Sequence, residues 1–194
     1  MKKSKVCIGL SNPKSPENVN SVKRAAGNFR VDSILYTGKR YPRAVKLNPA
    51  TTNMSRDVSL NVPVTGVACL IDEKPENMEI VCVEFAEDAI SLPNYQHPDN
   101  ALYIFGPEDG TLSQEIIDRA DAVVYVPTKG CMNLAAAVNV VLYDRLSKSS
   151  QYDASNELIR QSRDTNNNLK TTKVHKPPQS PVAKSRRPKA KKGK

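Results

Sequence analysis

The sequence has few metal-binding residues and no long apolar stretch. Histidine occurs only at positions 97 and 175, and the four cysteines form no CxxC pair and no cluster with histidine. This spacing argues against a zinc site and against a disulfide framework, so we expect reduced cysteines, no metal cofactor and a cytoplasmic protein. Because the apolar runs are too short for a signal peptide or a membrane span, we also expect no membrane partner.

The common phosphate-binding motifs are absent as well. The glycine-containing turn at 106–110 reads GPEDG, which is neither GxGxxG nor GxxxxGK[ST]. That difference excludes the usual mononucleotide and dinucleotide loops. The segment is predicted to be a turn in which Gly106 and Gly110 are able to take positive φ angles, because glycine adopts them at no steric cost.

The positive charge is concentrated at the carboxyl-terminal end of the sequence. Residues 1–148 contain 17 Lys+Arg and 17 Asp+Glu, whereas residues 149–194 contain 12 and 3, a net charge of +9. This shift predicts one domain over 1–148 and a disordered basic tail over 149–194. The tail either keeps the protein soluble or binds polyanions such as RNA through its cations, and the final KSRRPKAKKGK favours the second interpretation.

Apolar runs alternate with helical patterns along residues 1–148. We predict strands at 5–10, 31–37, 80–85, 101–105 and 122–126, and helices at 18–28, 113–120 and 133–146. Pro13 and Pro16 predict an ordered turn before the first helix. The alternation indicates an α/β fold with a mainly parallel sheet sandwiched by helices. Loops that follow the last two strands then lie at the carboxyl edge, where open α/β sheets bind ligands.

Two connecting segments carry residues of uncertain role. Residues 38–57 carry cations close to Tyr36 and Tyr41, either as a polar surface loop or as an RNA-facing loop with cations on phosphates and tyrosines stacked on bases. The cations are Lys39, Arg40, Arg43, Lys46 and Arg56. In the loop at 87–100 we expect Tyr95, Gln96 and His97 to be exposed. We also expect His97 to be a surface residue rather than a catalytic base, because nothing nearby in the sequence orients it.

Three segments together resemble the motifs of the SpoU-type RNA ribose methyltransferases of the SPOUT superfamily. The first is NPKSPENVNSVKRAAGNF, in which Asn18 and Arg24 have the spacing of a family Asn and Arg. The second is FGPEDG, and the third is a strand ending in Val-Pro followed by CMNLAAAV. The sequence departs from the family pattern at Cys131, where a serine is usual, and at Asn20, where a small residue is usual.

The resemblance implies a deep trefoil knot near the carboxyl-terminal end of the domain, a homodimer, and S-adenosylmethionine bound in the knot. By motif position, the cofactor-binding residues are Gly106, Val126, Cys131, Met132, Asn133 and Leu134. The predicted helix at 133–146 fits a dimer because its apolar side exceeds what one core face requires. That side comprises Leu134, Val138, Val141, Leu142 and Tyr143.

The resemblance also implies methyl transfer to a ribose 2′-hydroxyl of tRNA or rRNA, with Arg24, Asn18, Asn133 and Glu108 as the catalytic set. Such an in-line displacement needs alignment of the reacting atoms and help with the hydroxyl proton. A free arginine stays protonated at neutral pH, so we expect Arg24 to orient the hydroxyl and contact the adjacent phosphate. Asn18 and Asn133 would hold the ribose and orient Arg24.

Two further expectations concern Glu108 and Cys131. We expect Glu108 to hold the GPEDG turn by accepting backbone hydrogen bonds, and it could face Arg24 or RNA. Cys131 has no histidine partner in sequence, which argues against a nucleophile. Its replacement of the family serine is the one observation that favours the alternative, a catalytically silent RNA-binding protein that kept the fold.

Overall fold

The chain forms two compact units, residues 1–152 and 153–194. The structure, a computed structural model, describes residues 4–47 and 61–171. Part of the predicted RNA-facing loop, including Arg56, and the basic residues 172–194 of the predicted tail lie outside this range. In the second unit the structure describes one short helix, α6 (Asn156–Ser162), whose N-cap hydroxyl on Ser155 accepts a hydrogen bond from the Leu158 amide.

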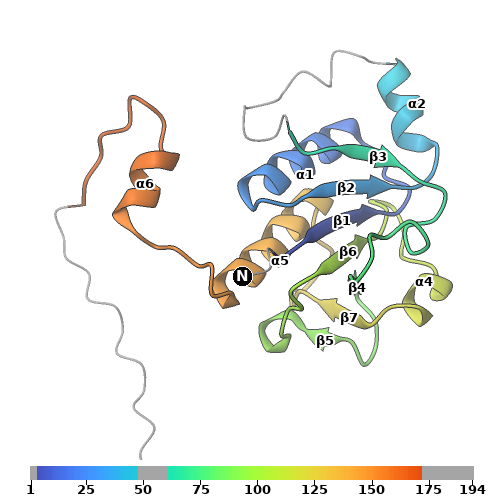
Figure 1. Ribbon diagram of the computed structural model, residues 1–194. Helices are drawn as coiled ribbons and strands as arrows, with labels where there is room; N and C mark the ends of the chain where they lie inside the picture. Colours follow the sequence, from blue (N-terminus) through green and yellow to red (C-terminus); the bar gives the residue numbers. More distant parts are fainter. Residues whose placement is uncertain (1–3, 48–60, 172–194) are drawn as a thin grey trace, which may run out of the picture. The chain divides into compact units, whose positions relative to one another are not determined.

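A seven-stranded sheet forms the centre of the first unit (Figure 1). Its order is β3-β2-β1-β6-β4-β7-β5, and every described pair is parallel. The strands are β1 (Val6–Leu10), β2 (Ser33–Tyr36), β3 (Val64–Gly66), β4 (Glu79–Val83), β5 (Ile90–Ser91), β6 (Ala101–Phe105) and β7 (Ala122–Tyr125). The predicted parallel α/β fold is therefore confirmed, and the carboxyl ends of these strands share one edge.

All five predicted strands are present, and two short ones were missed. β3 has three residues in a segment that Pro63 and Gly66 interrupt, and β5 has two residues within the predicted loop at 87–100. Both strands lie at the outer edges of the sheet. Strands this short contain too few apolar residues for a recognisable pattern.

Side chains alternate between two buried cores, one on each face of the sheet. Helices α1 (Pro16–Asn28) and α5 (Leu134–Lys148) pack against each other on one face, over residues such as Ile8 and Tyr103. The other core contains Leu102 and Ile104 beneath α4 (Gln114–Asp118) and the 67–78 segment. Every residue of β1 and β6 is buried, as expected for central parallel strands covered on both faces.

Helix α1 begins earlier than predicted. The predicted turn at Pro16 is wrong, because this proline is the first residue of the helix and Ser15 is its N-cap. Proline is favoured at that position because its ring fixes a helical φ and its missing N–H would have no partner there. The Ser15 hydroxyl accepts a hydrogen bond from the Asn18 amide at 3.2 Å. Asn18 therefore lies inside the first turn rather than before it.

Helix α5 uses most of its apolar side within the chain. Leu134, Val138, Val141 and Leu142 are each at most 7% exposed and belong to the core that α5 shares with α1. Only Tyr143 remains exposed, at 58%. The expectation that this helix has apolar surface left over for a dimer partner was therefore wrong for four of its five residues.

Helix α2 (Arg40–Leu47) lies within the segment 38–57, which was expected to be a loop. Tyr41 packs edge-on against Tyr36, with ring centroids 5.1 Å apart, and both rings lie against the α1–α5 core. Burial raises the pKa of the Tyr41 hydroxyl. These tyrosines thus pack the helix onto the domain, which argues against their predicted role in stacking on RNA bases. In the described ranges 4–47 and 61–171, no helix is long and apolar enough to cross a membrane.

Candidate functional site

A cavity of about 250 Å³ opens at the carboxyl ends of β4, β6 and β7. Its walls come from the ends of these strands, from the loops that follow them and from the first turn of α5. Five of the six predicted cofactor-binding residues line it: Gly106, Val126, Cys131, Met132 and Leu134. Asn133 lies at the start of α5, where its Oδ1 accepts hydrogen bonds from the Ala135 and Ala136 amides at 2.9 and 3.4 Å.

A chain of hydrogen bonds joins three of the four predicted catalytic residues. Glu108 Oε1 accepts from Asn18 Nδ2 at 3.1 Å, and Asn18 Oδ1 accepts from Asn133 Nδ2 at 3.0 Å. Glu108 also accepts from the backbone amides of Lys14 and Ser15, at 2.8 and 3.1 Å. Glu108 therefore fixes the segment that leads into α1, rather than its own turn as predicted.

The electrostatics of Glu108 favour its ionised form. Partial burial raises the pKa of this carboxyl, but the hydrogen bonds from Ser15, Asn18 and Lys14 outweigh burial, and the pKa lies below its usual value. A carboxylate at neutral pH can only accept hydrogen bonds. Asn18 must then direct its amide nitrogen to Glu108, which leaves its carbonyl oxygen to face Asn133.

Arg24 does not join this chain. Asn18 and Arg24 are six residues apart on α1, so they point about 120° apart around the helix axis. Arg24 is exposed, does not line the cavity, and has no side-chain hydrogen bond or ion pair in the part of the chain that the structure describes. Its guanidinium is therefore free to meet a molecule that approaches from solvent.

Glu84, at the carboxyl end of β4, is a cavity residue that the sequence analysis missed. Its carboxylate accepts hydrogen bonds from the backbone amide of Phe85 at 2.9 Å and from that of Leu112 at 3.0 Å. The second bond connects the end of β4 to the loop after β6. A Cβ added to Gly106 would lie 3.2 Å from Glu84 Oε2. Glycine thus allows a close approach here, and neither Gly106 nor Gly110 uses the positive φ that a glycine is able to take. A charged residue directly after the apolar run IVCV was the available signal.

Asp109 connects the loop after β6 to two neighbouring segments. Arg40 donates to both of its carboxylate oxygens, at 2.8 and 2.9 Å, and Lys14 Nζ lies 3.6 Å away. The hydrogen bonds from Arg40 hold the pKa of Asp109 below its ordinary value. These groups are substantially exposed, so the pair contributes little to stability and serves mainly to set the position of the loop beside α2.

Cys131 is exposed at the mouth of the cavity, and no histidine lines that cavity. The expectation that Cys131 is not a nucleophile stays a prediction. Over the described residues, no group of three or more His, Cys, Asp or Glu side chains could hold a metal ion.

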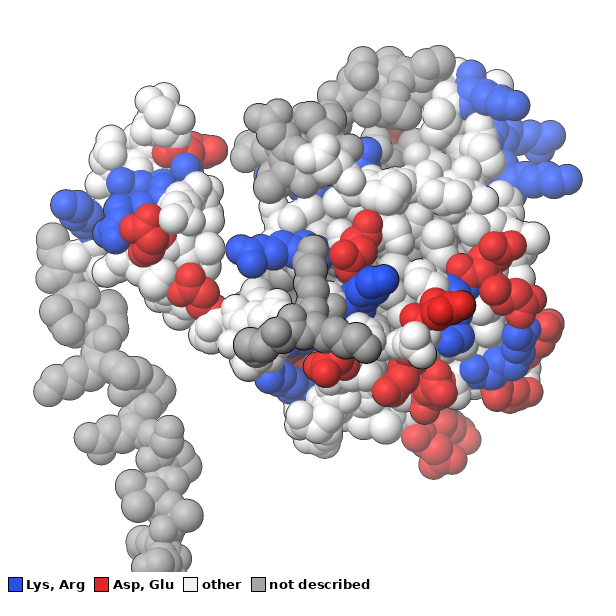
Figure 2. All heavy atoms as spheres, viewed as in Figure 1, with Lys and Arg blue, Asp and Glu red and all other residues white. Residues whose placement is uncertain are grey.

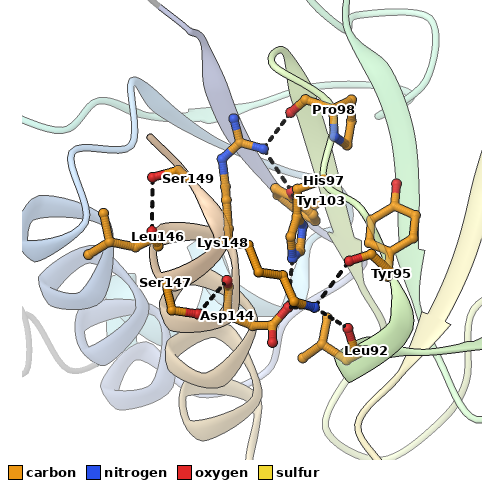
Figure 3. Close-up of polar contacts among 11 residues, drawn as sticks. Leu92, Tyr95, His97, Pro98, Tyr103, Asp144, Leu146, Ser147, Lys148 and Ser149 are labelled. Atoms are coloured by element: carbon orange, nitrogen blue, oxygen red, sulfur yellow. Dashed lines mark hydrogen bonds and ion pairs between the residues drawn. The ribbon is translucent and has the colours of Figure 1, made fainter. Parts of the chain in front are cut away.

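His97 lies in a buried polar cluster at the opposite, amino edge of the sheet (Figure 3). Its side chain is 4% exposed and bonds to the Tyr103 hydroxyl at 2.7 Å and to Asp144 at 2.9 Å. The predictions of an exposed Tyr95 and an exposed, unoriented His97 were therefore wrong. The orienting Asp144 is 47 positions away, on α5, and packing of that helix over β6 brings it close.

The donors in this cluster determine the tautomer of His97. The Asp144 carboxylate can only accept, so Nε2 of His97 donates to it. In a neutral imidazole Nδ1 is then the acceptor of the Tyr103 hydroxyl hydrogen at 2.7 Å, while Arg145 donates to that hydroxyl at 3.0 Å. Burial lowers the pKa of His97, and Arg145 and Lys148 nearby act in the same direction, while Asp144 opposes them without reversing the shift. The imidazole is thus held neutral and structural, away from the cavity.

Comparison with known proteins connects the cavity to a family. Residues 5–143 match the SpoU rRNA Methylase family. The chain is 26% identical over 161 residues to the tRNA (cytidine-2′-O-)-methyltransferase TrmJ of Methanocaldococcus jannaschii, covering 74% of this chain and 68% of that protein. It is 25% identical over 145 residues to a Staphylococcus aureus protein assigned to the TrmH family of tRNA/rRNA methyltransferases, and it spans only 57% of the length of that relative.

Solved structures show the same fold. The TrmH/SpoU tRNA modifying enzyme of A. aeolicus has a TM-score of 0.63 at 19% identity, over 81% of this chain and 85% of that chain. The SpoU methyltransferase AviRb of Streptomyces viridochromogenes, solved in complex with AdoMet, has a TM-score of 0.57 at 19% identity, over 75% and 58% of the two chains.

Proposed function

The chain belongs to the SpoU rRNA Methylase family, and from this premise we propose that it transfers a methyl group from S-adenosylmethionine to a ribose 2′-hydroxyl of tRNA or rRNA. The observation that carries the proposal is the hydrogen-bonded set of Glu108, Asn18 and Asn133 beside the cavity. These residues come from three separate segments of the sequence, each of which matches a family motif. A protein that needed only the fold would not need to keep them joined.

The cavity suits the proposed cofactor by its lining. Apolar side chains such as Phe105, Met132 and Leu134 can cover an adenine ring. Glu84, Glu108 and Asp109 add carboxylates to the same lining, and their charge complements a cationic sulfonium and an ammonium group. When bound, S-adenosylmethionine supplies an electrophilic methyl group and leaves as a neutral thioether. We propose Gly106, Val126, Cys131, Met132, Asn133 and Leu134 as the residues that hold it.

The catalytic roles follow from what each side chain can still do. Asn133 is fixed by its cap on α5 and by its bond to Asn18, so the pair offers a rigid edge of amide groups for a ribose. Arg24 has no partner among the described residues, and we propose that it orients the hydroxyl and contacts the adjacent phosphate by electrostatics. As the new O–C bond forms and the C–S bond breaks, the hydroxyl proton would pass to solvent water, because a protonated arginine cannot accept it.

A transfer assay tests the proposal directly. The full chain is incubated with radiolabelled S-adenosylmethionine and RNA extracted from cells that lack it, and the RNA is digested to nucleosides. We expect label in 2′-O-methylated nucleosides. Label in a methylated base would contradict the ribose assignment. Absence of cofactor binding by calorimetry would instead indicate a silent RNA-binding protein.

We propose that the family's deep trefoil knot is present. The strand order supports it: β6 lies between β1 and β4, and α5 then returns to pack on α1. When the chain is stretched from its ends by optical tweezers, a knotted chain will extend less than its full contour length. Full extension would contradict the knot.

We also propose a homodimer with its interface outside the α5 core face. The exposed apolar side chains Phe85, Ile90 and Tyr143 support this, because each is at least 43% exposed. Sedimentation at micromolar concentration should give twice the monomer mass. Finally, we propose a domain over 1–148 and a flexible RNA-binding tail over 149–194. We also propose a cytoplasmic location, which fractionation of cells would test.

A further inference from the structure

Helix α2 carries an unusual concentration of positive charge. Residues 38–47 contain four Lys or Arg and no Asp or Glu, although residues 1–148 as a whole are balanced at 17 and 17. Without these four cations the rest of that span would have a net charge of −4. Among the described residues, Arg40 is the one of the four that has a side-chain partner, Asp109.

The three other cations lie on one side of the helix. Arg43 and Lys46 are three residues apart on α2, and Lys39 directly precedes the helix, four residues before Arg43, whose amide donates to the Lys39 carbonyl at 3.1 Å; this spacing places the three in one row. All three are exposed and have no side-chain partner in the part of the chain that the structure describes. Tyr41 and Ala44 are more buried, and Tyr41 packs against the core. We call this row the α2 stripe.

Like charges at these spacings repel each other and destabilise a helix. No acidic residue within α2 offsets that repulsion. Arg40 fastens the helix to the loop that lines the cavity, so the α2 stripe is held at the same edge of the sheet. A surface that is locally unfavourable when unoccupied, and fixed beside a substrate site, suits a ligand that supplies several negative charges.

The charge on this edge is also divided. Figure 2 shows Lys and Arg side chains gathered over α2, with Asp and Glu side chains lower on the same face. The cavity itself is lined by Glu84, Glu108 and Asp109. A polyanion is attracted to one side of the cavity and repelled from the other, which fixes the side from which it approaches.

From these observations, and on the basis of the proposed methyl transfer, we propose that the α2 stripe binds phosphates of the RNA segment flanking the nucleotide whose ribose is methylated. The contacts position the strand and carry no sequence information. The row of cations follows the backbone of one strand. The tyrosines of this region take no part, because they are packed beneath the helix.

A matched pair of double variants in the full chain tests the proposal. Arg43→Gln/Lys46→Gln removes two stripe cations, whereas Lys5→Gln/Arg30→Gln removes two exposed cations that precede β1 and β2 at the amino edge. Both lower the net charge by two and leave the tail intact. Binding to a 20-nucleotide single-stranded RNA is measured from low to moderate salt, with circular dichroism as a check on folding.

We expect the slope of log affinity against log salt to become shallower by about 1.4 in the stripe variant, because each lost single-strand phosphate contact removes about 0.7. The control variant should keep the wild-type slope, and both should bind S-adenosylmethionine like the wild type. Equal slopes in the two variants would overturn the proposal. It would also be overturned if the stripe variant showed the same decrease in slope when poly-glutamate replaces RNA, because the stripe would then not select phosphates. Methyl transfer by the wild type is measured in parallel. Its absence would count against the proposed function, whereas the salt slopes of RNA binding would still test the α2 stripe independently.

Discussion

The two edges of the sheet hold polar clusters of opposite character, and helix α5 reaches both. At the carboxyl edge its first turn meets Asn18 through Asn133, beside an open cavity. At the amino edge its last turns carry Asp144, Arg145 and Lys148 into the buried cluster around His97 (Figure 3). The same element therefore contributes to a site and to a closed structural contact.

The difference lies in how completely the polar groups are used. Lys148 donates to Asp144 and to the carbonyls of Leu92 and Tyr95, which occupies all three of its hydrogens. Arg24, in contrast, has no side-chain partner among the described residues. A saturated cluster can only stabilise the fold, whereas groups left open can bind a ligand. The contrast therefore lies between the saturated cluster around His97 and the unpaired Arg24, because Glu108, Asn18 and Asn133 at the carboxyl edge also bond to one another.

The largest test of this comparison is removal of the unpaired Arg24. Arg24→Ala should lower the rate of methyl transfer on the order of 100-fold, the typical cost of removing one electrostatic contact to a transition state. Affinity for S-adenosylmethionine, measured by calorimetry, should stay within a few-fold. Lys23→Ala on the same helix serves as the control. A near-normal rate in Arg24→Ala would show that an open side chain at this edge is not evidence of function.

At the amino edge, His97→Phe should leave activity unchanged and lower the free energy of unfolding. The loss should be roughly 1–3 kcal/mol, because two buried hydrogen bonds disappear. Tyr103 keeps its hydrogen bond from Arg145, and Asp144 keeps its hydrogen bond from Lys148. Urea denaturation gives the value, with Gln96→Ala as an exposed neighbour for comparison. A loss of methyl transfer in folded protein would mean that the two edges are coupled through α5.

The same histidine should make stability depend on pH. Burial lowers the pKa of His97 in the folded protein below its ordinary value near 6.5, so below that pH the unfolded chain binds the proton first. The free energy of unfolding should fall as pH drops from about 6.5 toward the folded pKa, and should be flat above 7. In His97→Phe this slope should disappear between about pH 5.5 and 7. Glu108 does not contribute to the slope in that range, because it is ionised in both the folded and the unfolded chain.

A smaller effect separates the two roles of Asn133. Asn133→Asp keeps an oxygen to cap α5 but cannot donate to Asn18, so stability should change little and methyl transfer should fall about tenfold, as expected for one lost hydrogen bond. Asn133→Ala loses the cap as well, at about 1 kcal/mol. Equal activity in Asn133→Asp and the wild type would show that the bond to Asn18 is only structural.

The smallest effects are expected outside both edges. If the tail is disordered as proposed, deleting residues 160–194 should reduce the salt dependence of RNA binding and leave S-adenosylmethionine affinity and thermal stability nearly unchanged, because a disordered segment buries little apolar surface. An unchanged salt slope would mean that the tail only improves solubility. Loss of folding would contradict the predicted boundary near residue 148.

The sequence alone was sufficient for the parts of the molecule that depend on local pattern. Apolar runs such as 101–105 predicted the central strands, because strands covered on both faces need apolar side chains at every position. The second and third motif segments include loops that line the cavity, and the first includes Asn18, which bonds to Glu108 and Asn133. Very short edge strands and the N-terminal start of α1 escaped, since two or three residues and a proline give weak local signals.

Only the tertiary structure decided which distant residues meet. Asn133 and Asn18 are 115 positions apart, and His97 and Asp144 are 47 apart, so no local pattern relates them. The strand order and the return of α5 onto α1 create both contacts, and they also bury the apolar side of α5 that the sequence suggested was free. The separation of Arg24 from Asn18 is equally geometric: it depends on whether the helix begins before or after Asn18, and the cap at Ser15 settles that.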